Sequence, residues 1–168
     1  MKTLEEQMSV YLQYHRNPKN RLTHFIGVPL IMFSLFVVLA LPRVELGGFS
    51  ISAATVFAVA VLIYYFRLDA VLAAAMTVFV AVLLVAAHGV ASEGVTPALL
   101  VFAAAFIGGW ILQLIGHVFE GKKPALVDNF FQVLIAPIFL MAEVFFALGY
   151  KREVAEKMEQ LARSQPGL

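Results

Sequence analysis

The chain has 168 residues, of which 61% are hydrophobic and 14% charged, with a mean hydropathy of +0.87 and a formal net charge of +1. A typical soluble domain is about half apolar and about a quarter charged, so this composition excludes an ordinary soluble protein and predicts a membrane protein. The small net charge gives no reason to expect a nucleic-acid partner. The absence of cysteine excludes disulfides and thiolate metal sites.

Residues 2–15 are predicted to form an amphipathic helix on the membrane surface. Apolar and aromatic residues recur there at helical spacing, at Leu4, Met8, Tyr11 and His15. The helix should end at Asn17-Pro18, because proline disfavours helical backbone at the residue before it. The segment lacks the pattern of a cleavable signal peptide.

Four apolar segments follow, each near the roughly 20 residues that a helix needs to cross the hydrocarbon core. They cover about residues 24–41, 50–66, 70–87 and 97–116. The second and third are joined by a very tight turn at residues 67–69. A fifth apolar segment, over about residues 126–149, is interrupted by polar residues and by Pro137. A polar helix over about residues 150–164 closes the chain.

The distribution of lysine and arginine predicts the orientation in the membrane. With both termini in the cytoplasm, every basic residue except Arg43 lies on the cytoplasmic side. The fifth segment would then dip into the membrane and return, with a break at Pro137, because its length is too short for two crossings. A plain fifth span is the alternative.

The sequence thus predicts an all-α, polytopic integral membrane bundle that forms a single domain over residues 1–168. It would have four spans plus a fifth broken or re-entrant segment, with amphipathic helices at both termini. Such a protein would lie in the inner (cytoplasmic) membrane of a bacterium or in the endoplasmic reticulum of a eukaryote. Both termini would be cytoplasmic.

Two polar motifs built around histidine lie at borders of the apolar segments, over residues 14–24 and 113–129. Groups that can bind a metal are costly inside a membrane, so their presence marks function. A single histidine at such a border is usually only an interfacial polar residue. On the predicted topology, however, His15, His24 and His117 lie at one membrane face and can converge. His88 would end the third span at the opposite face, about 30 Å away, and is excluded from the site.

A carboxylate accompanies the second motif, because His117 and Glu120 are three residues apart and share one helix face. Imidazole together with carboxylate suits non-haem iron, manganese or zinc. We therefore interpret His15, His24 and His117 as metal ligands, and Glu120 and Asp128 as candidate catalytic groups. For Asp128, capping of the following helix is an equally good interpretation.

Both motifs resemble a family of membrane proteins formerly labelled only as a domain of unknown function. The specific stretches are Tyr14–Asn20 with His24 and Pro29, and Gly116–Glu120 with Pro124–Asn129. A yeast member of this family is an iron(II)-dependent dioxygenase of the endoplasmic reticulum, which shortens 2-hydroxy fatty acids by one carbon during phytosphingosine breakdown. The resemblance implies iron(II) as the cofactor, held by the three histidines. The donor chemistry of the residues themselves leaves zinc as the alternative metal.

The sequence therefore predicts an iron(II)-dependent dioxygenase acting on 2-hydroxy fatty acids, with O₂ and a membrane lipid or fatty acid as its partners. Basic side chains at the cytoplasmic border could pair with the substrate carboxylate: Arg16, Lys19, Lys122 and Lys123. Two alternatives differ in class. One is a zinc-dependent lipid hydrolase with the same ligands. The other is a non-enzymatic lipid-binding or assembly protein, in which the polar motifs only cap and pin helices.

Overall fold

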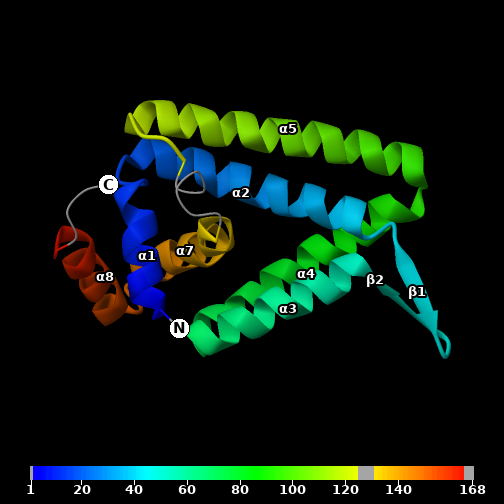
Figure 1. The fold of residues 1–168 in the computed structure, drawn as a ribbon, viewed down its shortest axis with the longest axis horizontal. Helices are drawn as coiled ribbons and strands as arrows, with labels where there is room; N and C mark the ends of the chain where they lie inside the picture. Colours follow the sequence, from blue (N-terminus) through cyan, green and yellow to red (C-terminus); the bar gives the residue numbers. More distant parts are fainter. Residues whose placement is uncertain (1, 125–130, 165–168) are drawn as a thin grey trace. The chain divides into compact units, whose positions relative to one another are not determined.

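The structure is a computed structural model that describes residues 2–124 and 131–164. The described part is 81% helical, with seven helices and one two-stranded ribbon. Contacts divide the chain into two compact units, one formed by residues 1–25 and 112–168 and the other by residues 26–111. Figure 1 shows the elements of both units. The expectation of a single domain over residues 1–168 stays a prediction.

The first unit is built around α1 (Leu4–Gln13), which packs against α7 (Gln132–Ala147) and α8 (Arg152–Ser164). Thr3 caps α1, because its hydroxyl accepts from the Glu6 amide while the Glu6 carboxylate accepts from the Thr3 amide. The core comes from the apolar faces of the three helices and includes Met8, Tyr11, Leu12, Ile135, Phe139 and Met158. The apolar face of α1 is thus covered by protein.

The predicted break before α2 is confirmed. Helix α1 ends at Gln13, and α2 (Pro18–Leu39) begins at Pro18 itself. Proline suits the first position of a helix, because an N–H group at that position would have no hydrogen-bond acceptor within the helix, so its absence costs no bond. The first residues of α2 and the last residues of α5 (Val95–Glu120) complete the first unit.

The predicted break at Pro137 is wrong. Pro137 lies inside α7, which continues unbroken on both sides of it. A proline removes one backbone hydrogen bond from a helix, and an apolar helix tolerates that loss when neighbouring groups compensate. The re-entrant form of the fifth segment is not confirmed.

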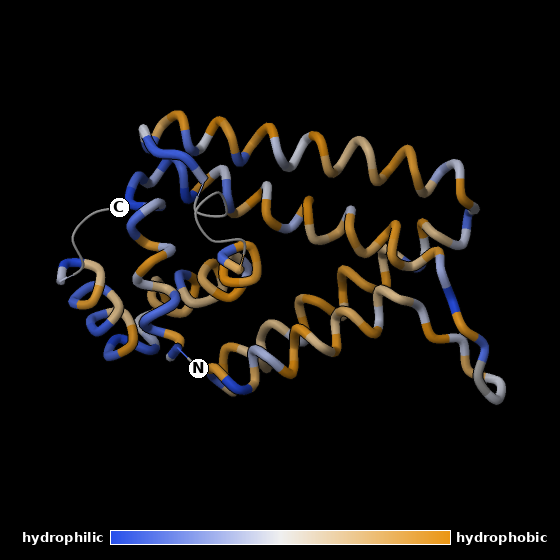
Figure 2. Tube along the Cα trace, viewed as in Figure 1, coloured by the Kyte–Doolittle hydropathy of each residue, from blue (hydrophilic) through white to orange (hydrophobic). Residues whose placement is uncertain are grey.

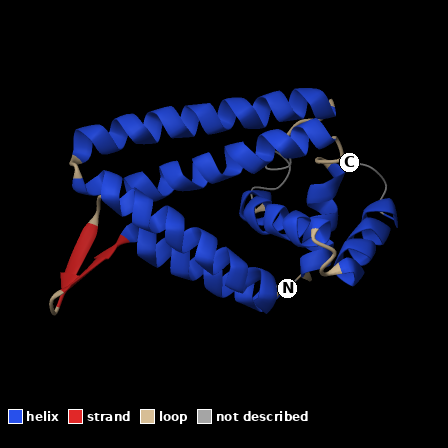
Figure 3. Ribbon diagram, turned by 180° about the vertical axis from the view of Figure 1, so that it is seen from behind, coloured by secondary structure: helices blue, strands red, loops and turns tan. Residues whose placement is uncertain are grey.

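The second unit contains α3 (Ala53–Leu68) and α4 (Ala70–Ser92), which lie side by side in Figures 1 and 3. The tight turn between them is confirmed, with Asp69 as its central residue. The Asp69 carboxylate accepts from the amides of Val71 and Leu72 and so caps α4. Parts of α2 and α5 also belong to this unit. They approach closely at Gly109, where a Cβ would contact Ile31 and the backbone of Gly27.

A β-ribbon precedes α3, where the sequence analysis had predicted a loop after about residue 41 and an apolar span from about residue 50. Strand β1 (Arg43–Leu46) pairs antiparallel with β2 (Phe49–Ser52), as the red arrows in Figure 3 show. Gly47 and Gly48 connect them with φ values of +55° and +90°, a conformation that a two-residue hairpin turn needs and that glycine adopts freely. The apolar segment expected to begin near residue 50 therefore becomes helical at Ala53.

Three helices in the described residues are long and apolar enough to cross a membrane: α2 with 22 residues, α4 with 23 and α5 with 26. Helices α3 and α7 are apolar but have 16 residues each, so the four-span topology is not confirmed. Figure 2 shows α3 and α4 hydrophobic over most of their length, whereas hydrophilic residues recur along α8. Large apolar side chains stay exposed, including Val59, Val78, Val85 and Ile107. This is the surface expected of a membrane protein.

Candidate metal centre

Three histidines converge in the first unit. His15 follows α1, His24 lies in α2 and His117 lies in α5, and one ring nitrogen of each is within 4.8 Å of the others. All three side chains are buried, with exposed fractions of 2%, 2% and 6%. Within residues 2–124 and 131–164, no other group of histidine and acidic side chains has this arrangement. The convergence expected from the two motifs is therefore present in the structure.

Backbone carbonyls fix the protonation of two of these rings. His15 Nδ1 lies 2.8 Å from the carbonyl oxygen of Tyr11, and His24 Nδ1 lies 2.9 Å from that of Asn20. A carbonyl can only accept a hydrogen bond, so both Nδ1 atoms must carry the hydrogen. In a neutral imidazole the other nitrogen, Nε2, then carries a lone pair. Both rings thus present an Nε2 lone pair to the site.

These two lone pairs face each other, because His15 Nε2 and His24 Nε2 are 3.1 Å apart. Two acceptors at hydrogen-bond distance repel unless a cation, a proton or a metal ion, lies between them. Burial, together with the nearby His24, lowers the pKa of His15 well below its usual range, so a proton is disfavoured. The donor set therefore fits a metal ion.

His117 supplies a third nitrogen. Its Nδ1 atom is buried and has no hydrogen-bond partner among the described residues, while the ring has a hydrogen bond with the backbone of Lys122. The His117 ring centroid lies 5.0 Å from that of His15 and 5.1 Å from that of His24. Neutral imidazoles with one nitrogen hydrogen-bonded and the other available are the usual form of histidine metal ligands.

Aromatic packing holds the His15 ring in place. The ring stacks on Tyr11, with centroids 3.8 Å apart and an interplanar angle of 6°. Tyr11 in turn contacts Phe139 of α7, at 4.8 Å between centroids. Because α1 and α7 are packed together, this stack fixes the ring with little freedom to rotate and keeps water from one side of it.

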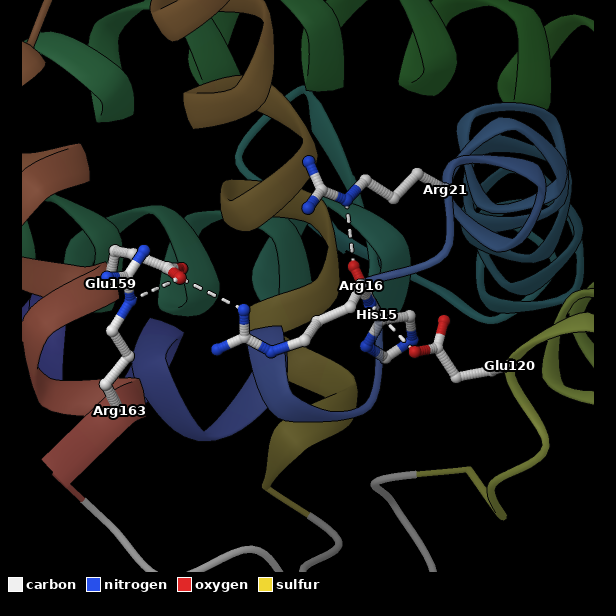
Figure 4. A network of polar contacts seen from close by, with 6 residues as sticks. All are labelled: His15, Arg16, Arg21, Glu120, Glu159 and Arg163. Carbon is white, nitrogen blue, oxygen red and sulfur yellow. Dashed lines mark hydrogen bonds and ion pairs between the residues drawn. The ribbon is translucent and has the colours of Figure 1, made fainter.

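Glu120 binds the backbone between α1 and α2. One carboxylate oxygen accepts from the Arg16 amide at 3.0 Å. The other accepts from the Asn17 amide at 2.8 Å and from the Asn20 side chain at 3.1 Å. Figure 4 shows the carboxylate directed at the backbone beside His15. The structure thus places this predicted catalytic group where it holds the loop that carries His15.

Gly116 permits the close approach of α5 to α2. A Cβ at this position would collide with the side chains of Asn20 and Thr23 and would also meet His24 Nδ1 at 3.2 Å. Because His117 is the next residue, the absence of a side chain at Gly116 brings the third histidine to the other two.

Arg21 is a part of the site that the sequence interpretation missed. Its Nε donates to the carbonyl oxygen of His15 at 2.8 Å, and its guanidinium forms an ion pair with Glu143 of α7 at 2.6 Å. Figure 4 shows Arg21 reaching the backbone at His15. The sequence analysis assigned neither Arg21 nor Glu143 to the site. Nothing in the local pattern of either residue indicates the pairing.

The four basic side chains proposed for a substrate carboxylate all have protein partners. Arg16 pairs with Glu159 at 3.0 Å, and Lys122 donates to the carbonyl oxygen of Gln13 at 3.1 Å. Lys19 lies over the Phe119 ring, 5.4 Å from its centroid, and Lys123 also interacts with the protein. Their substrate role stays a prediction.

Two other residues were singled out from the sequence. Asp128 lies outside the described residues. His88 belongs to the second unit, where its Nε2 hydrogen-bonds the Ser52 hydroxyl at 2.8 Å.

Gln113 is a buried polar residue one helical turn before His117 on α5. Its side chain is 7% exposed, and its amide nitrogen has no hydrogen-bond partner among the described residues. Residues four apart share one face of a helix, so Gln113 and His117 lie on the same side of α5. An unsatisfied buried donor is costly, which makes this amide a candidate to bind a ligand oxygen.

Comparisons with known proteins agree with the resemblance of the two histidine motifs. The model of the family described as "2-hydroxy-palmitic acid dioxygenase Mpo1-like" matches residues 1–148. The 2-hydroxy-palmitic acid dioxygenase MPO1 of Saccharomyces cerevisiae is 36% identical over 161 residues, which cover 93% of this chain and 87% of the yeast protein. No solved structure matches the chain. The chain therefore belongs to the Mpo1-like family of 2-hydroxy-palmitic acid dioxygenases.

Proposed function

We propose that the protein is an iron(II)-dependent dioxygenase that shortens 2-hydroxy fatty acids by one carbon. Membership of the family supports the reaction class. The observation that carries the proposal is the pair of Nε2 atoms of His15 and His24, 3.1 Å apart, next to the unpartnered Nδ1 of His117. Three neutral imidazoles in a buried site suit iron(II). When bound, iron(II) supplies the redox chemistry through which O₂ reacts with an organic substrate.

His15, His24 and His117 would hold the metal, and their environment would orient them. The carbonyl oxygens of Tyr11 and Asn20 keep hydrogen on Nδ1 of the first two rings, so both Nε2 atoms are permanently available. Second-shell bonds of this kind fix the tautomer and raise the basicity of a ligand. Glu120 and Arg21 hold the backbone on both sides of His15 and so preserve the spacing of the three rings.

The substrate would place its carboxyl end at the histidines and its alkyl chain among apolar side chains. The hydroxyl on C2 and the carboxylate can together chelate one metal, which would hold the C1–C2 bond in a reactive position. Orientation of this kind is a major source of rate. We propose that the Gln113 amide donates a hydrogen bond to a substrate oxygen. Buried Tyr11 and Phe139 would limit the access of water.

Arg16, Lys19, Lys122 and Lys123 remain our candidates for binding the carboxylate while the substrate enters. Each would have to exchange its present protein contact for the substrate, as Arg16 would exchange Glu159. The protein would lie in the inner membrane of a bacterium or in the endoplasmic reticulum of a eukaryote. Both termini would be cytoplasmic. The three histidines would then lie at the cytoplasmic border of the membrane, where a fatty acid can reach them from the lipid.

The decisive experiment combines metal analysis with substrate turnover. Protein purified without oxygen should retain iron, consume O₂ with 2-hydroxypalmitate and release a product one carbon shorter, as measured by mass spectrometry. Palmitate, which lacks the hydroxyl, should react much more slowly. If the iron-loaded protein leaves 2-hydroxy acids unchanged but the zinc-loaded protein hydrolyses a lipid ester, the dioxygenase proposal is wrong and the hydrolase alternative replaces it.

A further inference from the structure

The β-ribbon has two chemically different faces. Val44 pairs with Ile51 and Leu46 pairs with Phe49 across the strands. Cross-strand partners share a face, and residues two apart on one strand also share it, so the side chains of Val44, Phe49 and Ile51 lie on one apolar face of the ribbon. The other face carries two polar pairs, Arg43 with Ser52 and Glu45 with Ser50.

The apolar face is exposed in the protein. The exposed fraction is 60% for Val44, 75% for Phe49 and 37% for Ile51. An isolated two-stranded hairpin is at best marginally stable in water, and it needs another surface against which to bury an apolar face. In Figures 1 and 3 the ribbon projects away from α3 and α4 of its own unit. The helices of the second unit therefore do not provide that surface.

The position of the ribbon in the chain indicates a lipid surface as the missing cover. Helix α2, a candidate membrane span, ends at Leu39, and β1 begins at Arg43. A connection of that length reaches at most about 14 Å. The polar boundary of each leaflet is itself roughly 5–8 Å thick. The base of the ribbon must therefore lie in or next to the membrane boundary at which α2 ends.

We propose that this ribbon is an interfacial membrane anchor. Its apolar face, with Val44, Phe49 and Ile51, inserts into the boundary between headgroups and acyl chains, while its polar face points to water and headgroups. The face thereby gains the apolar cover that it lacks within the protein. The proposal depends on α2 crossing the membrane and is independent of the dioxygenase function.

The absence of cysteine allows a direct test. Single cysteines at Val44, Phe49 and Ile51 on the apolar face, and at Glu45 and Ser50 on the polar face, would each carry an environment-sensitive fluorophore. The labelled full-length protein would be reconstituted into phosphatidylcholine vesicles. Quenching would be measured with lipids brominated near the top of the acyl chain and, separately, with aqueous iodide. Phe49→Cys and Ser50→Cys form the matched pair, because they are adjacent and differ in face.

The expected result is an alternation along each strand. Quenching by brominated lipid should be at least about twofold stronger for the labels at positions 44, 49 and 51 than for those at 45 and 50. Aqueous iodide should instead quench the labels at 45 and 50 more strongly. Equal quenching on both faces would overturn the proposal. So would a label at Phe49→Cys that neither quencher reaches, because protein would then cover the face. A loss of that protection on dilution with lipid would identify a second copy as the cover. Circular dichroism of each variant confirms that the helices are intact.

Discussion

His15 Nε2 and His24 Nε2 lie 3.1 Å apart, and each ring is hydrogen-bonded through Nδ1 to a backbone carbonyl of its own segment. A neutral imidazole has one N–H group, so neither Nε2 has a hydrogen to offer the other. Hydrogen bonding between neutral rings therefore cannot account for this contact. Two Nε2 lone pairs at this distance fit two ligands of one cation. The following predictions test the metal site formed by His15, His24 and His117.

The histidines should be required individually for metal binding. His15→Ala, His24→Ala and His117→Ala should each lose most of the bound metal, with a decrease larger than the roughly 10–100-fold typical of second-shell changes. His88→Ala is the control, because His88 bonds to Ser52 in the other unit. Metal content is measured by mass spectrometry after purification without oxygen. Full occupancy in His117→Ala would refute the site.

Glu120→Gln should destabilise the protein and weaken metal binding together. The substitution removes the charge that accepts two hydrogen bonds from backbone amides of the His15 loop and one from the Asn20 side chain in α2. Hydrogen bonds to charged groups contribute about 1.5–3 kcal/mol each. Glutamine keeps one acceptor oxygen and therefore part of these bonds, so we expect a loss of about 2–4 kcal/mol in the free energy of unfolding. The metal affinity should fall about 10–100-fold.

Glu159→Gln is the matched control for this change. Its carboxylate binds the exposed side chains of Arg16 and Arg163, so the free energy of unfolding should change by less than about 1 kcal/mol. If Glu120→Gln keeps its stability and its metal but loses activity, Glu120 acts instead as an acid or base in the reaction.

Arg21 should contribute more to metal binding than its partner Glu143 does. Arg21→Lys removes the Nε donor to the His15 carbonyl, whereas Glu143→Gln leaves that bond in place. We expect Arg21→Lys to lower the free energy of unfolding by about 1–2 kcal/mol and to weaken metal binding. Glu143→Gln should affect mainly stability. Titration of metal into both apoproteins and into the double variant tests this order, and a stronger effect of Glu143→Gln on metal affinity would contradict it.

The metal-free protein should lose stability in acid. Burial lowers the pKa of His15 below its ordinary value of 6.5 in the unfolded chain. Between these two pKa values the unfolded state binds a proton that the folded state does not, so the free energy of unfolding falls as the pH falls below 6.5. The slope should approach about 1.4 kcal/mol per pH unit for this one group. Thermal unfolding in detergent measures the profile. His15→Gln should flatten it, and an equally steep profile in that variant would exclude His15 as the source.

Gln113→Leu should impair turnover while leaving the metal in place. The substitution removes a buried amide donor that has no partner among the described residues, so the stability should be unchanged or higher. The value of kcat/KM for a 2-hydroxy fatty acid should fall about tenfold or more, because a hydrogen bond to the substrate is lost. Unchanged kcat/KM with normal metal content would show that the amide does not contact the substrate.

Much of the architecture was predictable because its causes are local. Hydropathy alone predicts apolar helices in the stretches that form α2, α4 and α5. Asn17-Pro18 predicts the break between α1 and α2, because proline sterically disfavours helical backbone at the residue before it. The ribbon was equally local but was missed. Polar and apolar residues alternate from Arg43 to Ser52 around Gly47-Gly48, which is a hairpin signal. The apolar character of the following helix obscured it, so the predicted span began near residue 50.

The sequence by itself indicated a membrane protein and grouped His15, His24 and His117, because the predicted topology places all three at one membrane face and groups that can bind a metal are costly inside a membrane. Only the tertiary structure decided the role of the side chains around the three histidines. Glu120 is attached to the backbone of the His15 loop, and Arg21 joins that loop to Glu143 of α7. The physical reason is that a carboxylate or guanidinium takes its role from the partners within about 3 Å of it. Glu120 lies 104 residues from Arg16, and Glu143 lies 122 residues from Arg21, so no local pattern indicates these contacts.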